Sequence, residues 1–360
     1  ADAEWVNKAA TNRVDEINTC IACNQACLDH TFQNQRASCL VNPRACFETE
    51  LVYVKTRKPR RIAVVGGGVA GMSAATVAAE RGHQVTLFEA GHELGGQFNL
   101  AKVVPGKEEF HETIRYFKTM IVKKGVEVRL NTRVSREQLE REGYDDVVVA
   151  TGVVPRPLKL DGAALPNVLN YTDVLKGARV GQRVAVIGAG GIGFDVSEYL
   201  LHDPRVPQPQ PLADWQREWG VDPRVDYHTE GGLIRPKVQS AYREIYLLQR
   251  KSTSVGAGLG KTSGWVHRAS LKKHGVRMMR GVQYQRITPE GLWITIDGQA
   301  QLLRVDTIVV CAGQDSVCDI MPPDKLLTGA RYHIIGGAKL AAELDAKRAI
   351  REGAELAARL

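Results

Sequence analysis

Residues 61–75 read Arg-Ile-Ala-Val-Val-Gly-Gly-Gly-Val-Ala-Gly-Met-Ser-Ala-Ala, a segment that indicates the fold class. Its apolar start suits a buried parallel strand, and good helix formers follow the glycines. Gly66, Gly68 and Gly71 occupy the three positions of G-x-G-x-x-G. The first glycine allows a tight turn, the second lets backbone N–H groups approach a pyrophosphate, and the third lets helix and strand pack closely. The stretch therefore predicts a dinucleotide site, and Ala70 in the same turn is predicted to contact the cofactor.

The strand expected at residues 84–89 ends in Glu89. In this type of fold an acidic residue about 20 positions beyond the glycines hydrogen-bonds a ribose hydroxyl. The N-terminus of the intervening helix faces the anionic pyrophosphate. We therefore expect Glu89 to bind the ribose of the first nucleotide.

Residues 183–193, Arg-Val-Ala-Val-Ile-Gly-Ala-Gly-Gly-Ile-Gly, repeat the pattern with Gly188, Gly190 and Gly193. The second strand of this unit is expected at residues 244–249. It is delayed by a segment over residues 202–238 that is too long for an ordinary loop and is expected to form a functional cover. Arg250 and Lys251 stand where a carboxylate would end the strand. Cations there accommodate a 2′-phosphate, so the sequence favours NADPH over NADH.

Further contacts are expected at the carboxyl edge of each sheet, where ligands of such folds gather. Lys107 is interpreted as a solvated charge or as a cofactor contact. Trp265 belongs either to the core or to an aromatic wall of the nucleotide site. The other predicted cofactor contacts are Gly96, Gln97, Val134, Thr151, Gly152, Gly313 and Gly337.

Composition limits the choice of partners. The chain has 360 residues, of which 44% are hydrophobic and 24% charged, as in a protein of two or three domains. Its net charge of +8 suits a nucleotide or a CoA ester. No helix-turn-helix, zinc-finger or RNP pattern supports nucleic-acid binding. The apolar run at residues 62–79 is broken by glycines and the N-terminus lacks a signal-peptide core, so we expect no membrane span and a cytoplasmic location.

Four cysteines precede the first glycine motif. Cys20, Cys23 and Cys27 are spaced to converge on one side of a helical turn, and Cys39 follows after eleven intervening residues. A [4Fe–4S] cluster takes four thiolates, whereas structural zinc more often uses two separated C-x-x-C pairs. We favour the cluster and keep zinc as the alternative; Cys46 is interpreted as a buried or spare thiol. Residues 1–19 are predicted to form an amphipathic helix without a partner. We therefore expect the chain to be the C-terminal part of a longer polypeptide or to dock on another subunit.

Two nested nucleotide domains resemble the flavin disulfide-reductase class of FAD- and NADPH-binding proteins. Three further stretches narrow the resemblance: Cys20-Ile-Ala-Cys23-Asn-Gln-Ala-Cys27-Leu, Val104-Pro-Gly-Lys107, and Gly258-Leu-Gly-Lys-Thr. With them the chain resembles the bacterial NADPH-dependent 2,4-dienoyl-CoA reductases over essentially its whole length. Trimethylamine and histamine dehydrogenases share this layout.

The resemblance implies an α/β fold with two nested Rossmann-like domains, preceded by a small Cys-rich helical segment. Residues 1–58 would hold the cluster, 59–180 with 305–360 would bind FAD, and 181–304 would bind NADPH. Electrons would pass from NADPH to FAD, to the [4Fe–4S] cluster and to FMN, which reduces an unsaturated acyl-CoA in fatty acid β-oxidation. The FMN and acyl-CoA sites of the family lie in an N-terminal (β/α)₈ barrel, a domain or subunit that this chain does not contain. No catalytic acid or base is therefore assigned.

Departures from the family pattern leave alternatives open. The C-terminal flavin motif commonly has Gly-Asp, where this chain has Gly336-Gly337-Ala338, followed by an Ala-rich helix expected over residues 340–359. Cys311 and Cys318 are too far apart for a redox pair, which disfavours disulfide reduction. The alternatives are an amine dehydrogenase type that holds only ADP, and a non-catalytic docking module with structural iron.

Overall fold

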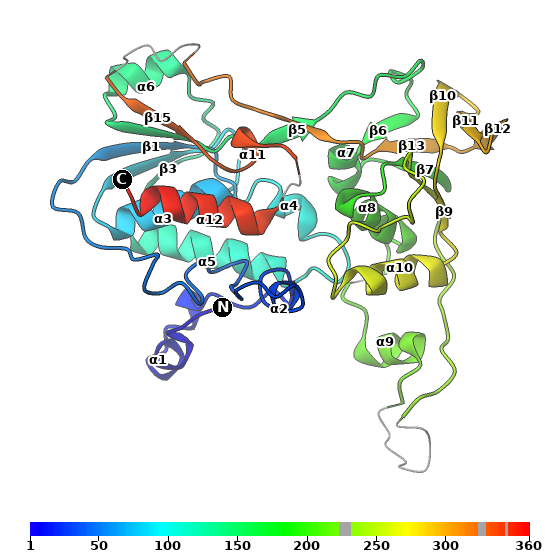
Figure 1. Cartoon of the computed structure of the whole chain (residues 1–360), viewed down its shortest axis with the longest axis horizontal. Coiled ribbons are helices and arrows are strands. Elements are labelled where there is room, and N and C mark those ends of the chain that lie inside the picture. The colour runs from blue at the N-terminus through cyan, green and yellow to red at the C-terminus, as the bar shows by residue number, and fades with distance from the viewer. Residues whose placement is uncertain (207, 223–231, 323–328, 343–344) are drawn as a thin grey trace.

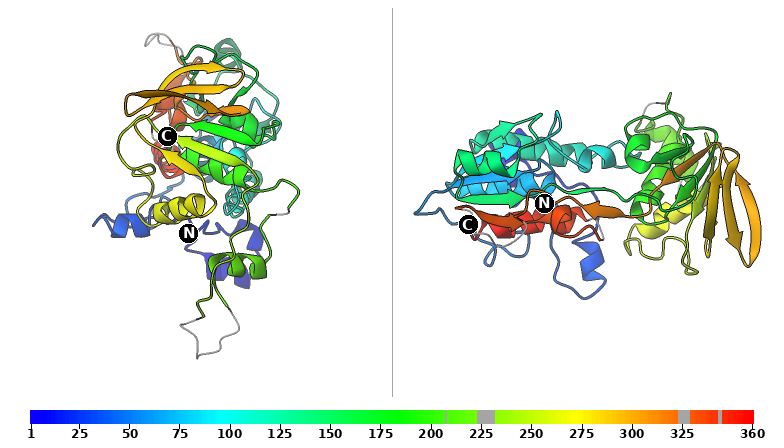
Figure 2. Two further views of the ribbon diagram at one scale, coloured as in Figure 1. Left: turned by 90° about the vertical axis from the view of Figure 1, so that its right-hand side faces the viewer. Right: turned by 90° about the horizontal axis from the view of Figure 1, so that it is seen from above.

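The computed structural model describes residues 1–206, 208–222, 232–322, 329–342 and 345–360. It has two lobes, each built around a five-stranded parallel sheet (Figure 1). A short antiparallel pair, β5 (Val153–Pro155) with β14 (Gln314–Ser316), lies where the chain passes between the lobes (Figure 2). The fold class predicted from the two glycine motifs is confirmed.

The first sheet has the strand order β15-β4-β1-β2-β3, and all its pairs are parallel. Apolar residues alternate between its two faces, so that Ile62 and Val64 pack in one core and Ala63 and Val65 in another. Both faces are therefore buried, as parallel sheets require. Its strands are β1 (Arg61–Val65), β2 (Gln84–Phe88), β3 (Glu127–Arg129), β4 (Asp146–Val149) and β15 (Arg331–Ile334).

Three helices cover one face of this sheet: α3 (Val69–Glu80), α5 (Phe110–Lys123) and α12 (Ala346–Ala357) (Figure 1). Helices α3 and α12 pack closely against each other. A Cβ atom added to Gly353 would lie 2.4 Å from the carbonyl oxygen of Ala70, so only glycine permits this spacing. The C-terminal helix is thereby held against the start of α3, where the first glycine turn ends.

The second sheet has the order β6-β13-β7-β8-β9, also parallel throughout. Helices pack on one face, and a three-stranded antiparallel sheet packs on the other through Leu292 and Ile294. The strands of the parallel sheet are β6 (Val168–Asn170), β7 (Arg183–Ile187), β8 (Glu244–Leu248), β9 (Arg277–Met279) and β13 (Thr307–Val310). The other elements of this lobe are α7 (Tyr171–Leu175), α8 (Gly191–Leu201), α9 (Leu212–Trp219), α10 (Gly264–Lys273), β10 (Gln283–Thr288), β11 (Gly291–Ile296) and β12 (Gln299–Arg304).

The remaining elements are short. They are α1 (Trp5–Ala10), the 3-10 turn η1 (Val14–Glu16), α2 (Leu28–Thr31), α4 (Phe98–Ala101), α6 (Arg136–Glu142) and α11 (Gly336–Lys339). No helix among the described residues is long and apolar enough to cross a membrane.

Two helix predictions are wrong in extent. The helix expected over residues 1–19 ends at Ala10, because the chain turns at Asn12, whose φ is +54°. The helix expected over residues 340–359 begins at Ala346, because the Asp345 side chain caps it by accepting from the Lys347 backbone N–H at 2.8 Å. In both places local polar residues override a favourable apolar or Ala-rich pattern.

The second sheet also extends beyond the predicted limits of the inserted domain. Strand β6 precedes residue 181, and β13 follows residue 304, yet both belong to this sheet. The expectation that the chain returns to the first domain at Val305 is therefore wrong, because β13 pairs with β6 and β7. In the segment expected to form a cover, residues 207 and 223–231 lie outside the described part of the chain.

Candidate functional site: two dinucleotide loops and a cysteine segment

The first glycine loop follows β1 and begins α3. Gly66 has a φ of +112°, and a Cβ there would lie 2.3 Å from the Ala150 carbonyl oxygen. A Cβ on Gly71 would lie 1.9 Å from the Gly66 carbonyl oxygen, so helix and turn touch at this position. A Cβ on Gly68 would meet no atom within 4 Å, so there is open space on this side of its backbone at the start of the helix. This is the arrangement that a pyrophosphate needs.

The second glycine loop, between β7 and α8, has the same geometry. Gly188 has a φ of +107°, and a Cβ there would lie 2.6 Å from the Cys311 carbonyl oxygen. A Cβ on Gly193 would lie 1.9 Å from the Gly188 carbonyl oxygen, and one on Gly190 would meet nothing within 4 Å. The two loops therefore offer two equivalent anion cradles, one in each lobe.

Glu89 lies beside the first loop, at the end of β2. Its carboxylate accepts hydrogen bonds from the backbone N–H of Gly67 at 2.7 Å and of Gly91 at 2.6 Å. These bonds fix the carboxylate next to the open glycine backbone. Val134 is buried in the same core cluster as Phe88, the residue before Glu89. The structure thus brings Glu89 and Val134 to the carboxyl edge of the first sheet.

The loop at residues 95–97 closes over the same place. Gly95 donates its backbone N–H to the Gly67 carbonyl oxygen at 2.9 Å, and a Cβ on Gly96 would lie 3.0 Å from the Gly68 Cα. Gln97 follows and accepts a hydrogen bond from the Tyr171 hydroxyl at 3.3 Å. Gly96 is therefore adjacent to the first cradle, and Gln97 connects it to α7.

Tyr171 is a residue that sequence reasoning missed. Its side chain is only 2% exposed, and its hydroxyl also accepts from the Gln314 side-chain amide at 2.7 Å. Burial raises the pKa of this phenol above its usual range. Gln97, Tyr171 and Gln314 come from three distant segments, so no local signal in the sequence indicates the network.

The predicted contacts near β5 and β14 also come together. Thr151 donates its hydroxyl to the Val317 carbonyl oxygen, and Gly152 has a φ of +73°. A Cβ on Gly337 would lie 3.3 Å from the Gly152 Cα, so the two glycines are neighbours. Gly313 lies at the other end of this region, beside Arg156.

Lys107 has a partner that the sequence did not suggest. Its ammonium lies 2.6 Å from the carboxylate of Asp195 on α8, and both side chains are 23% exposed. It is therefore not a solvated charge, and a cofactor contact there stays a prediction. Trp265 is 60% exposed in the first turn of α10, so its assignment to the core is wrong.

Arg250 and Lys251 follow β8 and are exposed. The Lys251 carbonyl oxygen accepts from the Gly281 backbone N–H at 3.0 Å. This bond holds the residues after β8 against those after β9. Neither cation makes an ion pair with any residue that the structure describes.

The cysteine segment has no disulfide, since all its thiols are free. Burial raises the pKa of the Cys23 thiol to about 11, and the other three cysteines of the set add to the rise. Among the described residues no group of three or more His, Cys, Asp or Glu side chains is arranged to hold a metal ion. Cluster ligation therefore stays a prediction. Cys46 is exposed, so the alternative of a buried thiol is wrong, and its interpretation as a spare thiol stays a prediction.

The backbone around Cys23 is unusual. Ala22 and Asn24 both adopt left-handed conformations, with φ of +53° and +58°. An alanine in this region is strained, and such strain collects at ligand sites. The backbone N–H of Ala22 also donates to the Cys20 sulfur at 3.4 Å. This geometry fits a loop shaped to present thiolates.

The chain is similar to known proteins of a family that binds pyridine nucleotides, in keeping with the two glycine loops. Residues 60–335 match the family model of pyridine nucleotide-disulphide oxidoreductases. The metal reductase of Desulforamulus reducens is 32% identical over 323 residues, which cover 88% of this chain and 47% of that protein. The NADH oxidase of Thermoanaerobacter brockii is 39% identical over 209 residues, covering 56% of this chain and 32% of that protein.

A solved structure extends the likeness to the whole chain. A 2-naphthoyl-CoA reductase in complex with 2-naphthoyl-CoA superposes with a TM-score of 0.83 at 26% identity, covering 100% of this chain and 49% of that one. The chain thus spans about half the length, or less, of the proteins it matches. The family binds FAD and a nicotinamide nucleotide, in keeping with the two cradles. This chain therefore belongs to the pyridine nucleotide-disulphide oxidoreductase family and is an oxidoreductase flavoprotein.

Proposed function

We propose that this chain is the electron-transfer part of an NADPH-dependent reductase of the 2,4-dienoyl-CoA reductase type. Its carriers are NADPH, FAD and a [4Fe–4S] cluster on Cys20, Cys23, Cys27 and Cys39. The acceptor is an FMN in an N-terminal (β/α)₈ barrel, present as a further domain or as a separate subunit. The substrate in that barrel is an unsaturated fatty acyl-CoA of β-oxidation. The whole-chain likeness to a reductase of a CoA ester supports this substrate class.

The observation that carries the proposal is the repeated cradle geometry. In each lobe one glycine turns the chain, one leaves open space beside the backbone, and one lets the helix approach the turn so closely that a Cβ atom there would lie 1.9 Å from a carbonyl oxygen. Gly68 and Gly190 present backbone N–H groups to the pyrophosphates of FAD and NADPH, and Glu89 holds the FAD ribose. When both are bound, the cofactors supply hydride transfer and one-electron steps, while the protein fixes their positions.

The cysteine segment is anchored to both lobes, as an electron relay requires. Ile21 and Leu40, each next to a cysteine, are buried in the core cluster that includes α3. On the other side, the Asp29 carboxylate accepts from the Thr262 backbone N–H at 2.9 Å and from its hydroxyl at 2.6 Å. Asp29 is 7% exposed, so this contact between α2 and the loop before α10 is shielded from water. The cysteine segment therefore contacts both lobes, which supports its role as the relay.

The test is a rapid-mixing experiment on anaerobically purified protein. Bound flavin and iron are first measured per chain, and the protein is then mixed with NADPH or NADH. We expect flavin and iron in every chain, and faster loss of flavin absorbance with NADPH. Bound ADP with no bleaching by either nucleotide would instead indicate the amine dehydrogenase type. Iron without a reducible flavin would indicate a docking module.

A further inference from the structure

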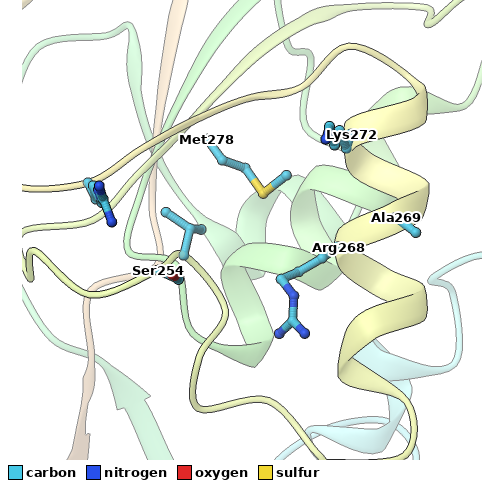
Figure 3. Close-up of a pocket in the computed structure, with 7 residues that line it drawn as sticks. Ser254, Arg268, Ala269, Lys272 and Met278 are labelled. Carbon is cyan, nitrogen blue, oxygen red and sulfur yellow. The ribbon is translucent and has the colours of Figure 1, made fainter.

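A cavity at the edge of the second sheet carries three basic residues (Figure 3). It measures about 420 Å³ and lies between α10, β9 and the loop after β8. Arg268 and Lys272 come from α10, and Arg280 follows β9. Ser254 and Met278 also line the cavity. No acidic residue lines the cavity.

The positive charge in this cavity is not neutralised by the protein. Arg268 donates one hydrogen bond to the Gly256 carbonyl oxygen at 2.9 Å, and the rest of its guanidinium is free to bind a ligand. Within the described part of the chain, neither Arg268, Lys272 nor Arg280 takes part in an ion pair.

In a second cavity, by contrast, the arginine side chains are neutralised by carboxylates of the protein itself. It measures about 200 Å³ and contains Arg348 and Arg351. Both are paired inside the cavity wall, Arg348 with Glu352 at 3.5 Å and Arg351 with Glu355 at 2.6 Å. The three cations of the larger cavity lack such partners, so the anion that they suit must come from outside the chain.

The cavity lies beside the expected ribose end of the second nucleotide. Gly281 and Val282, the residues after Arg280, donate backbone hydrogen bonds to the carbonyl oxygens of Lys251 and Gln249, both at 3.0 Å. Arg280 is thereby held next to Lys251 at the carboxyl edge of β8 and β9. A dinucleotide whose pyrophosphate rests on the Gly190 cradle places its adenosine ribose at this edge.

We infer that this cavity takes the 2′-phosphate of the nucleotide, and that Arg280, Arg268 and Lys272 set the preference for NADPH beyond Arg250 and Lys251. The inference rests on the proposed function, because it assumes that NADPH binds the second lobe. A phosphomonoester is a dianion with three strong acceptor oxygens. Two guanidinium groups match its geometry, an ammonium adds charge, and the Ser254 hydroxyl adds a neutral donor.

The test is calorimetric binding of 2′,5′-ADP and of ADP to the holoprotein and its variants. Arg280→Ala and Lys272→Ala remove exposed side chains, so the fold is expected to stay intact. Each variant should lower the affinity for 2′,5′-ADP roughly tenfold and the affinity for ADP by less than about threefold. A hydrogen bond to a charged group contributes enough binding free energy to account for the roughly tenfold loss. Arg277→Ala is the matched control: it removes the same charge from β9, but Arg277 pairs with Glu244 at 3.1 Å and does not line the cavity.

The outcomes separate the inference from the proposed function. If the unaltered protein binds 2′,5′-ADP no more tightly than ADP, the assignment of NADPH fails. If it prefers 2′,5′-ADP and Arg280→Ala and Lys272→Ala keep that preference, only the cavity assignment fails, and the phosphate lies on Arg250 and Lys251. Equal losses in the cavity variants and in Arg277→Ala would show a general charge effect and would also overturn the inference.

Discussion

The Lys107 ammonium lies 2.6 Å from the Asp195 carboxylate, and this ion pair joins the loop before α5 in the first lobe to α8 in the second. Both side chains are mostly shielded, so solvent screens the pair less than it screens a surface contact. The nucleotide cradles of the two lobes are connected by this contact and by the network around Tyr171. Apolar packing adds to these polar contacts, since Val104 from the first lobe is buried in the core cluster of the second lobe.

Lys107→Ala is expected to lower the free energy of unfolding by about 1–2 kcal/mol, because it leaves a partly buried carboxylate without its partner. Urea denaturation followed by circular dichroism measures the change. Lys118→Ala is the control, since Lys118 pairs with Glu93 at 3.8 Å within one lobe and both side chains are more exposed. A cost no greater than that of the control would show that the pair does not hold the lobes together.

Tyr171→Phe removes a hydroxyl that serves both Gln97 and Gln314. We expect a loss of about 1–3 kcal/mol in stability, since the buried amide of Gln314 then lacks this partner. Tyr246→Phe is the matched control: the Tyr246 hydroxyl bonds Glu244 at 2.9 Å at an exposed site, where water replaces it. The same urea experiment compares the two variants, and equal effects would contradict the role assigned to the network.

Gly68→Ala and Gly71→Ala separate cofactor binding from folding. A methyl group on Gly68 meets no protein atom, so the variant should fold and yet bind FAD roughly tenfold or more weakly, because the methyl lies where the pyrophosphate approaches. A methyl group on Gly71 would lie 1.9 Å from the Gly66 carbonyl oxygen, so this variant should be destabilised by about 1–3 kcal/mol or more. Flavin content and thermal unfolding are the two measurements. Full flavin affinity in the Gly68→Ala protein would show that the first glycine loop does not bind the pyrophosphate.

Cys23→Ser is expected to abolish iron binding while leaving bound FAD reducible by NADPH. Serine is a poor ligand in a site that takes four thiolates. Iron analysis and the flavin spectrum give the two readouts, and Cys46→Ser serves as the control because Cys46 is an exposed thiol outside the set. Unchanged iron in Cys23→Ser, or equal loss in both variants, would contradict the ligand assignment.

The local parts of this architecture were predictable from sequence. Strand, glycine turn and helix follow one another within 20 residues in each lobe, and the carboxylate of Glu89 ends the next strand. These features depend on backbone conformation and on short-range packing, which the residue types themselves specify.

The contacts between segments were not predictable in the same way. The partners in Lys107–Asp195 and in Gln97–Tyr171 are 88 and 74 positions apart, and they meet only because the lobes pack as they do. The helix expected over residues 340–359 was overestimated because alanine-rich composition does not reveal the cap at Asp345. Strand β13 was assigned to the wrong sheet because an apolar strand carries no mark of its neighbours.

In the proposed function, reducing power enters at the second cradle and leaves through the cysteine segment. Low-temperature electron paramagnetic resonance of anaerobic protein mixed with NADPH tests it most directly. We expect a reduced iron–sulfur signal that appears with NADPH, is lost in Cys23→Ser, and is much weaker in Gly190→Ala. A flavin that bleaches fully with NADPH while no iron–sulfur signal develops in the unaltered protein would contradict it.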